Sequence, residues 1–162
     1  LDVTSLYTNI PHSEVLQACS EAWETRTVNN PPTHFLVKLL DLVLKLNNFE
    51  FNEENYLQIN GTAMGTKMSP LYANIFMGKL EGQLLALVEH TPYQWVRFID
   101  DIKMKCQYGR ESLDDLVSKA NNFHPSIKFM AEISNSNHVF LDTTTRLLEN
   151  KLHTDIYSKP TD

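Results

Sequence analysis

The spacing of apolar residues changes between a helical and a strand-like period several times along the chain. The helical period is clearest at residues 71–90, where apolar side chains recur every three or four positions and predict one long helix. Similar spacing predicts three more helices beginning near Ser13, Thr33 and Ser112, whose side chains can cap a first turn. Asp115 would complete a capping box with Ser112. The stripe of the long helix consists of Ala73, Met77, Leu80, Leu84, Leu87 and Val88.

Stretches between these helices are rich in β-branched and aromatic residues and predict strands. Residues 1–8 form the first, and apolar side chains alternate again over residues 126–134. Short runs on either side of residues 52–55 and of residues 99–101 predict two hairpins, and residues 138–157 predict further strands. Helices and strands mix without strict βαβα alternation. We therefore expect an α+β fold, with helices packed on one face of a largely antiparallel sheet.

Two adjacent aspartates interrupt the second hairpin, in the stretch WVRFIDDIKMKC at residues 95–106. Neighbouring carboxylates repel each other, and removing either from water is costly unless a partner compensates its charge. Asp favours turns, so Asp100 and Asp101 could form a solvated β-turn. Alternatively, they bind a cation. The glycine-containing loop at residues 61–70 precedes a helix start, which favours anions because its backbone N–H groups are unpaired.

Composition indicates the general class of protein but says little about its function. The chain has 162 residues, of which 42% are hydrophobic and 10% aromatic, as in an ordinary globular domain. No apolar run approaches the roughly 18–20 residues of a membrane-spanning helix. The two cysteines lack a metal-binding spacing, so we expect a reducing compartment. A net charge of −6, taken alone, argues against a nucleic-acid-binding surface, which is usually basic.

Three motifs in order resemble the palm of a reverse transcriptase. LDVTSLYTNIP at residues 1–11 resembles polymerase motif A, GTAMGTKMSPLYANIFMG at 61–78 resembles motif B, and RFIDDI at 97–102 resembles motif C. These motifs, with FLD and YSKPTD within residues 140–162, most resemble Penelope-like retroelements. The resemblance implies that residues 1–162 are a palm fragment of an RNA-directed DNA polymerase, with a palm-like antiparallel sheet. Its fingers and thumb would lie outside the chain.

The resemblance implies a site for two Mg²⁺ ions, which Mn²⁺ could replace. Asp2 and Asp100 would hold both metals, Asp101 would be a weaker ligand, and the backbone carbonyl of Val3 would be a further ligand. Hard cations take carboxylate oxygens together with substrate phosphates. Two metals can clamp the attacking and leaving oxygens of a phosphoryl displacement. This chemistry requires that the strands carrying Asp2 and Asp100 be neighbours in the sheet.

The resemblance also implies contacts to the incoming nucleotide. Tyr7 stands where the family has an aromatic steric gate against a 2′-OH, although a core aromatic is the plain alternative. Gly65 stands where backbone must approach nucleotide and template, although it could be a turn former. Met64 replaces the glutamine of many relatives and can pack against a base, and Ser69 starts the next helix beside it. Lys128 is a candidate general acid for the leaving pyrophosphate, or part of a solvated strand face.

The implied partners are an RNA template, a DNA primer and deoxynucleoside triphosphates, without a membrane. Basic fingers residues that grip the triphosphate would precede Leu1 and the thumb would follow Asp162, so we expect the isolated fragment to be inactive. The life cycle of such elements implies an intracellular, nuclear location. Two alternatives stay open. One is a catalytically inactive palm retained as a nucleic-acid-binding or interaction module, and the other is a different palm-fold enzyme such as a nucleotide cyclase.

Overall fold

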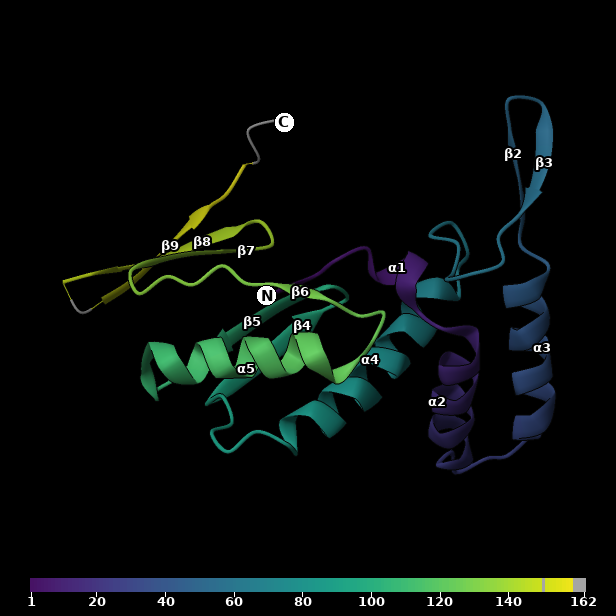
Figure 1. The fold of residues 1–162 in the computed structure, drawn as a ribbon, viewed down its shortest axis with the longest axis horizontal. Helices are drawn as coiled ribbons and strands as arrows, with labels where there is room; N and C mark the ends of the chain where they lie inside the picture. The colour runs from purple at the N-terminus through teal and green to yellow at the C-terminus, as the bar shows by residue number, and fades with distance from the viewer. Residues whose placement is uncertain (150, 159–162) are drawn as a thin grey trace.

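The computed structural model describes residues 1–149 and 151–158 of the chain (Figure 1). Its helices are α1 (Leu6–Asn9), α2 (His12–Glu24), α3 (Thr33–Lys45), α4 (Ser69–Leu85) and α5 (Gly109–Phe123). Its strands are β1 (Asp2–Val3), β2 (Asn48–Phe51), β3 (Glu54–Leu57), β4 (Gln94–Phe98), β5 (Asp101–Lys105), β6 (Phe129–Met130), β7 (Asn137–Phe140), β8 (Thr143–Leu148) and β9 (Lys151–Ile156). Most of the YSKPTD stretch lies outside the described residues. In the described part, no helix is long and apolar enough to cross a lipid bilayer.

A four-stranded antiparallel sheet in the order β4-β5-β1-β6 forms the centre of the fold. Helices α4 and α5 lie along one face of this sheet (Figure 1). Val3, Ile102 and Phe129 come from three neighbouring strands and are all buried on that face, because residues in register across a sheet point to the same side. The predicted α+β fold, with helices packed on one face of an antiparallel sheet, is confirmed and is consistent with a palm.

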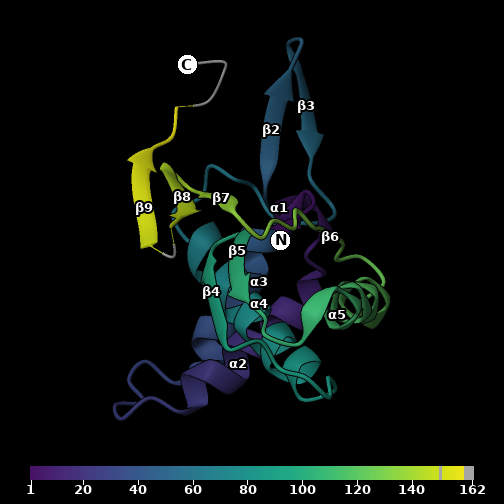
Figure 2. The ribbon, with the colours of Figure 1, turned by 90° about the vertical axis from the view of Figure 1, so that its left-hand side faces the viewer.

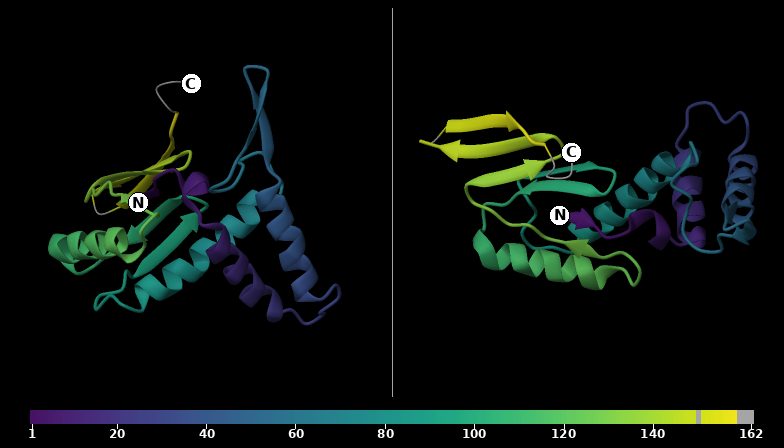
Figure 3. Two further views of the ribbon diagram at one scale, coloured as in Figure 1. Left: turned by 45° about the vertical axis from the view of Figure 1, so that its right-hand side comes forward. Right: turned by 90° about the horizontal axis from the view of Figure 1, so that it is seen from above.

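Two smaller sheets extend from this centre. The β2–β3 hairpin projects away from the helices (Figure 2). The β7-β8-β9 sheet lies on the side of the central sheet opposite to α5 (Figure 3). Lys103 on β5 donates a 3.5 Å hydrogen bond from Nζ to Thr145 Oγ1 on β8, and its Nζ lies 5.6 Å from the ring centroid of Phe140. The helix-free face of the central sheet is therefore partly covered at β5.

Helix α4 connects the parts of the core. Helix α2 packs beside α4, and α3 packs beside α2 (Figure 3). The predicted apolar stripe of α4 is confirmed as far as Leu84, which is 1% exposed. The helix ends at Leu85, and the Leu87 N–H turns back to the carbonyl of Leu84 at 3.0 Å. Leu87 is consequently 65% exposed, so the predicted stripe is wrong at this position.

The strand predicted over residues 1–8 is wrong beyond Val3. Ser5 has a φ of 49°, in the left-handed region, and turns the chain into α1. Thr8 Oγ1 donates a 2.9 Å hydrogen bond to the Ser5 carbonyl, and Asn9 Nδ2 donates to the same carbonyl at 3.1 Å. Such side chains compete with a strand ladder for backbone groups. Tyr7 therefore lies on a helical turn.

The predicted helix caps are also wrong. Ser13, Thr33 and Ser112 lie within α2, α3 and α5 rather than before them, so the capping box at Ser112 does not form. Pro11 and Pro32 directly precede α2 and α3. Proline has no side-chain oxygen that could accept a hydrogen bond from the first turn. The N–H of Thr33 is instead accepted by Asn29 Oδ1 at 3.2 Å.

The strand predicted over residues 126–134 shortens to β6, Phe129–Met130. Asn121 on α5 donates from Nδ2 to the Phe129 carbonyl at 3.0 Å, and its Oδ1 accepts the Phe129 N–H at 2.8 Å. This side-chain amide therefore takes the place of a neighbouring strand at the outer edge of β6. Ala131 is exposed, so the predicted inward alternation fails after Phe129.

We expect Leu84→Ala to lower the free energy of unfolding by about 2–5 kcal/mol, because it leaves a cavity among buried side chains. The matched control is Leu87→Ala, which removes the same atoms from an exposed position and should change stability by less than about 0.5 kcal/mol. Urea unfolding of both variants measures the difference. Equal losses in the two variants would contradict the assigned end of the α4 stripe.

Candidate active site

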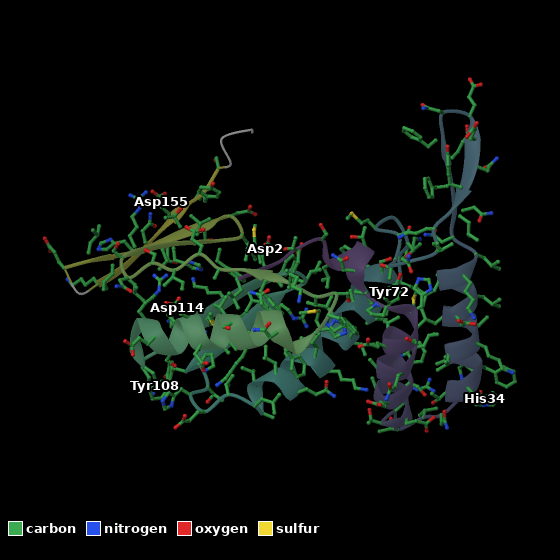
Figure 4. The ribbon with its side chains drawn as sticks, in the orientation of Figure 1. Asp2, His34, Tyr72, Tyr108, Asp114 and Asp155 are labelled. Carbon is green, nitrogen blue, oxygen red and sulfur yellow. The ribbon has the colours of Figure 1, made fainter. Side chains whose placement is uncertain are left out.

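Asp2 and Asp101 face each other across neighbouring strands. They are direct partners in the antiparallel β1–β5 pair. The adjacent pair, Leu1 and Ile102, exchanges two backbone hydrogen bonds of 2.7 Å, so the aspartates occupy the non-hydrogen-bonded position, where side chains lie closer together. Alternation along the strands turns both carboxylates away from the buried face of Val3 and Ile102. Asp2 accordingly lies on the side of the sheet away from α4 and α5 (Figure 4).

Asp100 lies in the turn that joins β4 to β5. The residue before it, Ile99, has a φ of 57°, a left-handed conformation that is a genuine outlier for a β-branched side chain. The Asp100 carbonyl accepts the N–H of Val3 at 3.0 Å. Strand β1 is therefore bonded to the turn as well as to β5, and all three aspartates lie at one end of the sheet. Asp2 therefore lies on a strand that neighbours β5, as expected, but it is Asp101 that pairs with it, and Asp100 lies in the turn before β5.

Tyr7 adds a phenol beside Asp100. Burial raises the pKa of the Tyr7 phenol, and the charges of Asp100 and Tyr72 raise that pKa further. The negative charge of Asp100 therefore acts on the Tyr7 phenol. Tyr7 is therefore neutral at physiological pH and retains an O–H that can donate a hydrogen bond.

The three carboxylates have the oxygen chemistry that a hard divalent cation prefers. Within the described residues, no group of three or more His, Cys, Asp or Glu side chains is arranged to hold a metal ion. Carboxylate oxygens are nevertheless suitable metal ligands here. Asp2 faces Asp101 across the two strands, and the charge of Asp100 raises the pKa of Tyr7.

The loop before α4 is anchored on α1. Thr62 donates its N–H to the Tyr7 carbonyl at 2.7 Å, and His12 Nε2 hydrogen-bonds to the Gly61 carbonyl at 2.6 Å. Gly61 has a φ of 66°, and a Cβ added there would lie 2.5 Å from the carbonyl oxygen of Thr8. This close approach requires glycine. The positions of the loop and of Tyr7 are therefore coupled.

Ser69 holds this loop together through buried hydrogen bonds. The side chain is fully buried. Its hydroxyl hydrogen-bonds to the Ala63 carbonyl and the Thr66 hydroxyl, and to the Tyr72 hydroxyl at 2.9 Å. The structure thus assigns Ser69 to the shape of the loop. Its contact with a nucleotide stays a prediction that this geometry does not support.

Met64 and Gly65 lie on the open part of the same loop. Met64 is 68% exposed, and a Cβ added at Gly65 would meet nothing within 4 Å. Both positions are accessible to a ligand, and the fold itself does not require glycine at residue 65. Their contacts with a nucleotide stay predictions.

Lys128 is engaged with the end of α5. Its Nζ donates to the carbonyls of Asn121 at 2.6 Å and His124 at 3.0 Å. A cation is favourable there because the last carbonyls of a helix lack partners. The Lys128 carbonyl also accepts the Thr4 N–H at 2.8 Å, just beyond β1. This geometry favours a structural role, and the general-acid role stays a prediction.

The sequence pattern did not predict a polar cluster behind the β4–β5 turn. Arg97 on β4 donates from Nε to Glu81 Oε1 at 2.8 Å and from Nη1 to Asn74 Oδ1 at 2.5 Å. The same Nη1 donates to the Ile99 carbonyl at 2.9 Å, and Trp95 Nε1 donates to Glu81 Oε1 at 3.0 Å. One signal was available. The acid at Glu81 and the base at Arg97 interrupt two apolar faces, and opposite charges on buried faces are usually paired.

We expect Gly61→Ala to destabilise the protein by at least about 1–3 kcal/mol, the usual cost of a left-handed non-glycine residue, because its Cβ also meets the Thr8 backbone. Gly65→Ala is the matched control, since it has open space, and should leave the unfolding midpoint nearly unchanged. Denaturant unfolding compares the two. Equal destabilisation would contradict the assignment of the close approach to Gly61.

We expect the Tyr7 phenol to titrate above its ordinary pKa of 10.0, and Asp100→Asn to lower that pKa by removing a charge that raises it. Since the folded-state pKa is the higher one, the contribution of Tyr7 to stability is present below about pH 10 and is lost as pH rises through the folded pKa. NMR of labelled tyrosine, assigned with Tyr7→Phe, measures the titration. Asp114→Asn on α5 is the control, and an unshifted pKa in Asp100→Asn would contradict the proximity of Asp100 to Tyr7.

Comparison with known proteins gives one result. A family model described as "Reverse transcriptase (RNA-dependent DNA polymerase)" matches residues 1–140, which include the facing aspartates, the loop before α4 and the β4–β5 turn. No curated protein and no solved structure matches the chain. The chain belongs to the reverse transcriptase family.

Proposed function

We propose that this chain is the catalytic palm of an RNA-directed DNA polymerase from a Penelope-like retroelement. It would add deoxynucleotides to the 3′-OH of a DNA primer on an RNA template. The single observation that carries the proposal is the placement of three aspartates at one end of the sheet, with Asp2 directly opposite Asp101. Within a chain of the reverse transcriptase family, this placement supports a catalytic site rather than a solvated turn.

The facing carboxylates support a role for divalent cations, which reverse transcriptases use. Like charges directly opposite each other destabilise a sheet, and a bound cation would remove that repulsion. Asp2, Asp100 and Asp101 would hold two Mg²⁺, or Mn²⁺ in their place, with the Val3 carbonyl as a further ligand. When bound, such metals neutralise charge on the transferred phosphoryl group and on the attacking and leaving oxygens. Asp101 would bind more weakly than the other two aspartates.

The chain's own residues would position the nucleotide. Tyr7 lies beside Asp100 and keeps its proton, so its ring can lie against the sugar as a steric gate. Because Thr62 is bonded to the Tyr7 carbonyl at 2.7 Å, the loop that carries Met64 and Gly65 is held at a fixed place relative to this ring. Met64 and Gly65 are accessible on that loop and would approach the base and backbone of the substrate.

The rest of the polymerase would supply most of the basic groups that bind phosphates. The net charge of this chain is −6, whereas a protein that binds nucleic acid neutralises phosphates with Lys and Arg. We therefore propose that fingers and thumb domains outside residues 1–162 grip the triphosphate and the primer–template duplex. The protein would act inside the cell, in the nucleus, where such an element integrates.

We expect Asp100→Asn in the full-length protein to reduce primer extension on an RNA template by more than about a hundredfold. Loss of a residue that merely supports a metal ligand already costs about 10–100-fold. Asp114→Asn makes the same change on the exposed face of α5 and should extend normally. A purified, folded protein measured for extension with Mg²⁺ provides the test. Retained extension in Asp100→Asn would overturn the assignment, and inactive wild-type protein that still binds primer–template would favour an inactive, nucleic-acid-binding palm.

A further inference from the structure

The Arg97 side chain joins the catalytic hairpin to α4. The side chain is 11% exposed, and its guanidinium bonds to residues of α4. It donates to the side chains of Glu81 and Asn74 and, through Nη2, to the Asn74 backbone carbonyl at 3.2 Å. All these acceptors belong to α4, so the guanidinium is held in a defined position by one rigid element.

Glu81 is the fixed point of this arrangement. Its side chain is as little exposed as that of Arg97, at 11%. Glu81 Oε1 accepts both the Arg97 Nε–H at 2.8 Å and the Trp95 Nε1–H at 3.0 Å. A buried ion pair contributes little net stability, because removing both charges from water offsets their attraction. The Arg97–Glu81 ion pair is therefore expected to have a role other than stabilising the fold.

Arg97 also bonds to the backbone of Ile99, next to Asp100. Arg97 Nη1 donates a 2.9 Å hydrogen bond to the Ile99 carbonyl, immediately before Asp100. Ile99 has a φ of 57°, and a non-glycine residue keeps such a conformation only where its surroundings impose it. The bond from Arg97 ties the strained peptide to α4. This hydrogen bond fixes the backbone of Ile99, and the conformation of Ile99 determines the direction of the following Asp100.

We propose that Arg97 is a positioning residue that holds the Ile99–Asp100 turn and so sets where Asp100 lies relative to Asp2 and Asp101. The inference rests on the proposed function for its consequence, which is metal affinity, but the effect on the turn is independent of it. The planar guanidinium is needed because it reaches Glu81, Asn74 and Ile99 at once. A lysine keeps the charge and can pair with Glu81, but it presents a single ammonium and cannot span all three.

The test compares Arg97→Lys with wild type in the full-length protein. We expect amide hydrogen exchange in the peptide 98–103 to become about tenfold faster, because local opening follows the loss of local bonds. We also expect the dissociation constant for Mn²⁺, measured by electron paramagnetic resonance, to rise about tenfold, as for other residues that orient metal ligands. Arg110→Lys is the matched control, because Arg110 forms an exposed pair with Asp114 on α5 and should change neither quantity.

A second, milder variant allows the test to be made even if Arg97→Lys does not fold. Asn74→Ala removes a side-chain contact of Arg97 from an exposed position, and we expect smaller changes in exchange and in Mn²⁺ affinity with the same sign. Unchanged exchange at residues 98–103 in both variants would overturn the inference, as would Mn²⁺ binding equal to wild type in Arg97→Lys. A wild-type protein that binds no Mn²⁺ would instead refute the proposed metal site, and the exchange rates would still decide whether Arg97 holds the turn.

Discussion

The register of the two-residue strand β1 governs the whole candidate site. Asp2 pairs with Asp101 on one side and Met130 on the other, and Val3 pairs with Phe129. Because side chains alternate along a strand, a slip of one residue would turn Asp2 toward α4 and α5 and expose Val3. Burial of Val3 and Phe129 against the helices opposes that slip. The apolar face of the sheet thus determines where the carboxylates lie on the opposite face.

Features that depend on local periodicity could be predicted from the sequence, and features that depend on contacts between distant segments could not. The stripe of α4 and the hairpin around Asp100 follow from spacing alone. Tyr7 was misplaced because the left-handed turn at Ser5 and its side-chain bonds override a β-branched stretch that favours a strand. The strand after residue 126 was overextended because the Asn121 amide, from another helix, ends the ladder at Phe129.

In the candidate site, too, some features could be predicted from the sequence and others could not. The proximity of Asp2 and Asp101 follows from two motifs that fall on adjoining strands, and Asp100 lies in the turn that directly precedes Asp101. The roles of Arg97 and Gly61 do not, because each depends on a contact that no local spacing encodes. Arg97 meets α4 residues 16 and 23 positions earlier, and Gly61 packs on the backbone of α1. Pairing of lone charges on buried faces is the sequence signal closest to predicting such contacts.

The Asn121 amide limits how the central sheet can grow. It occupies the outward N–H and carbonyl of Phe129, which are the groups that an incoming strand would need. The β6 edge is therefore closed to strand addition at this position. A segment that added beside β6, whether from the same polypeptide or from a partner, would first have to displace the Asn121 side chain.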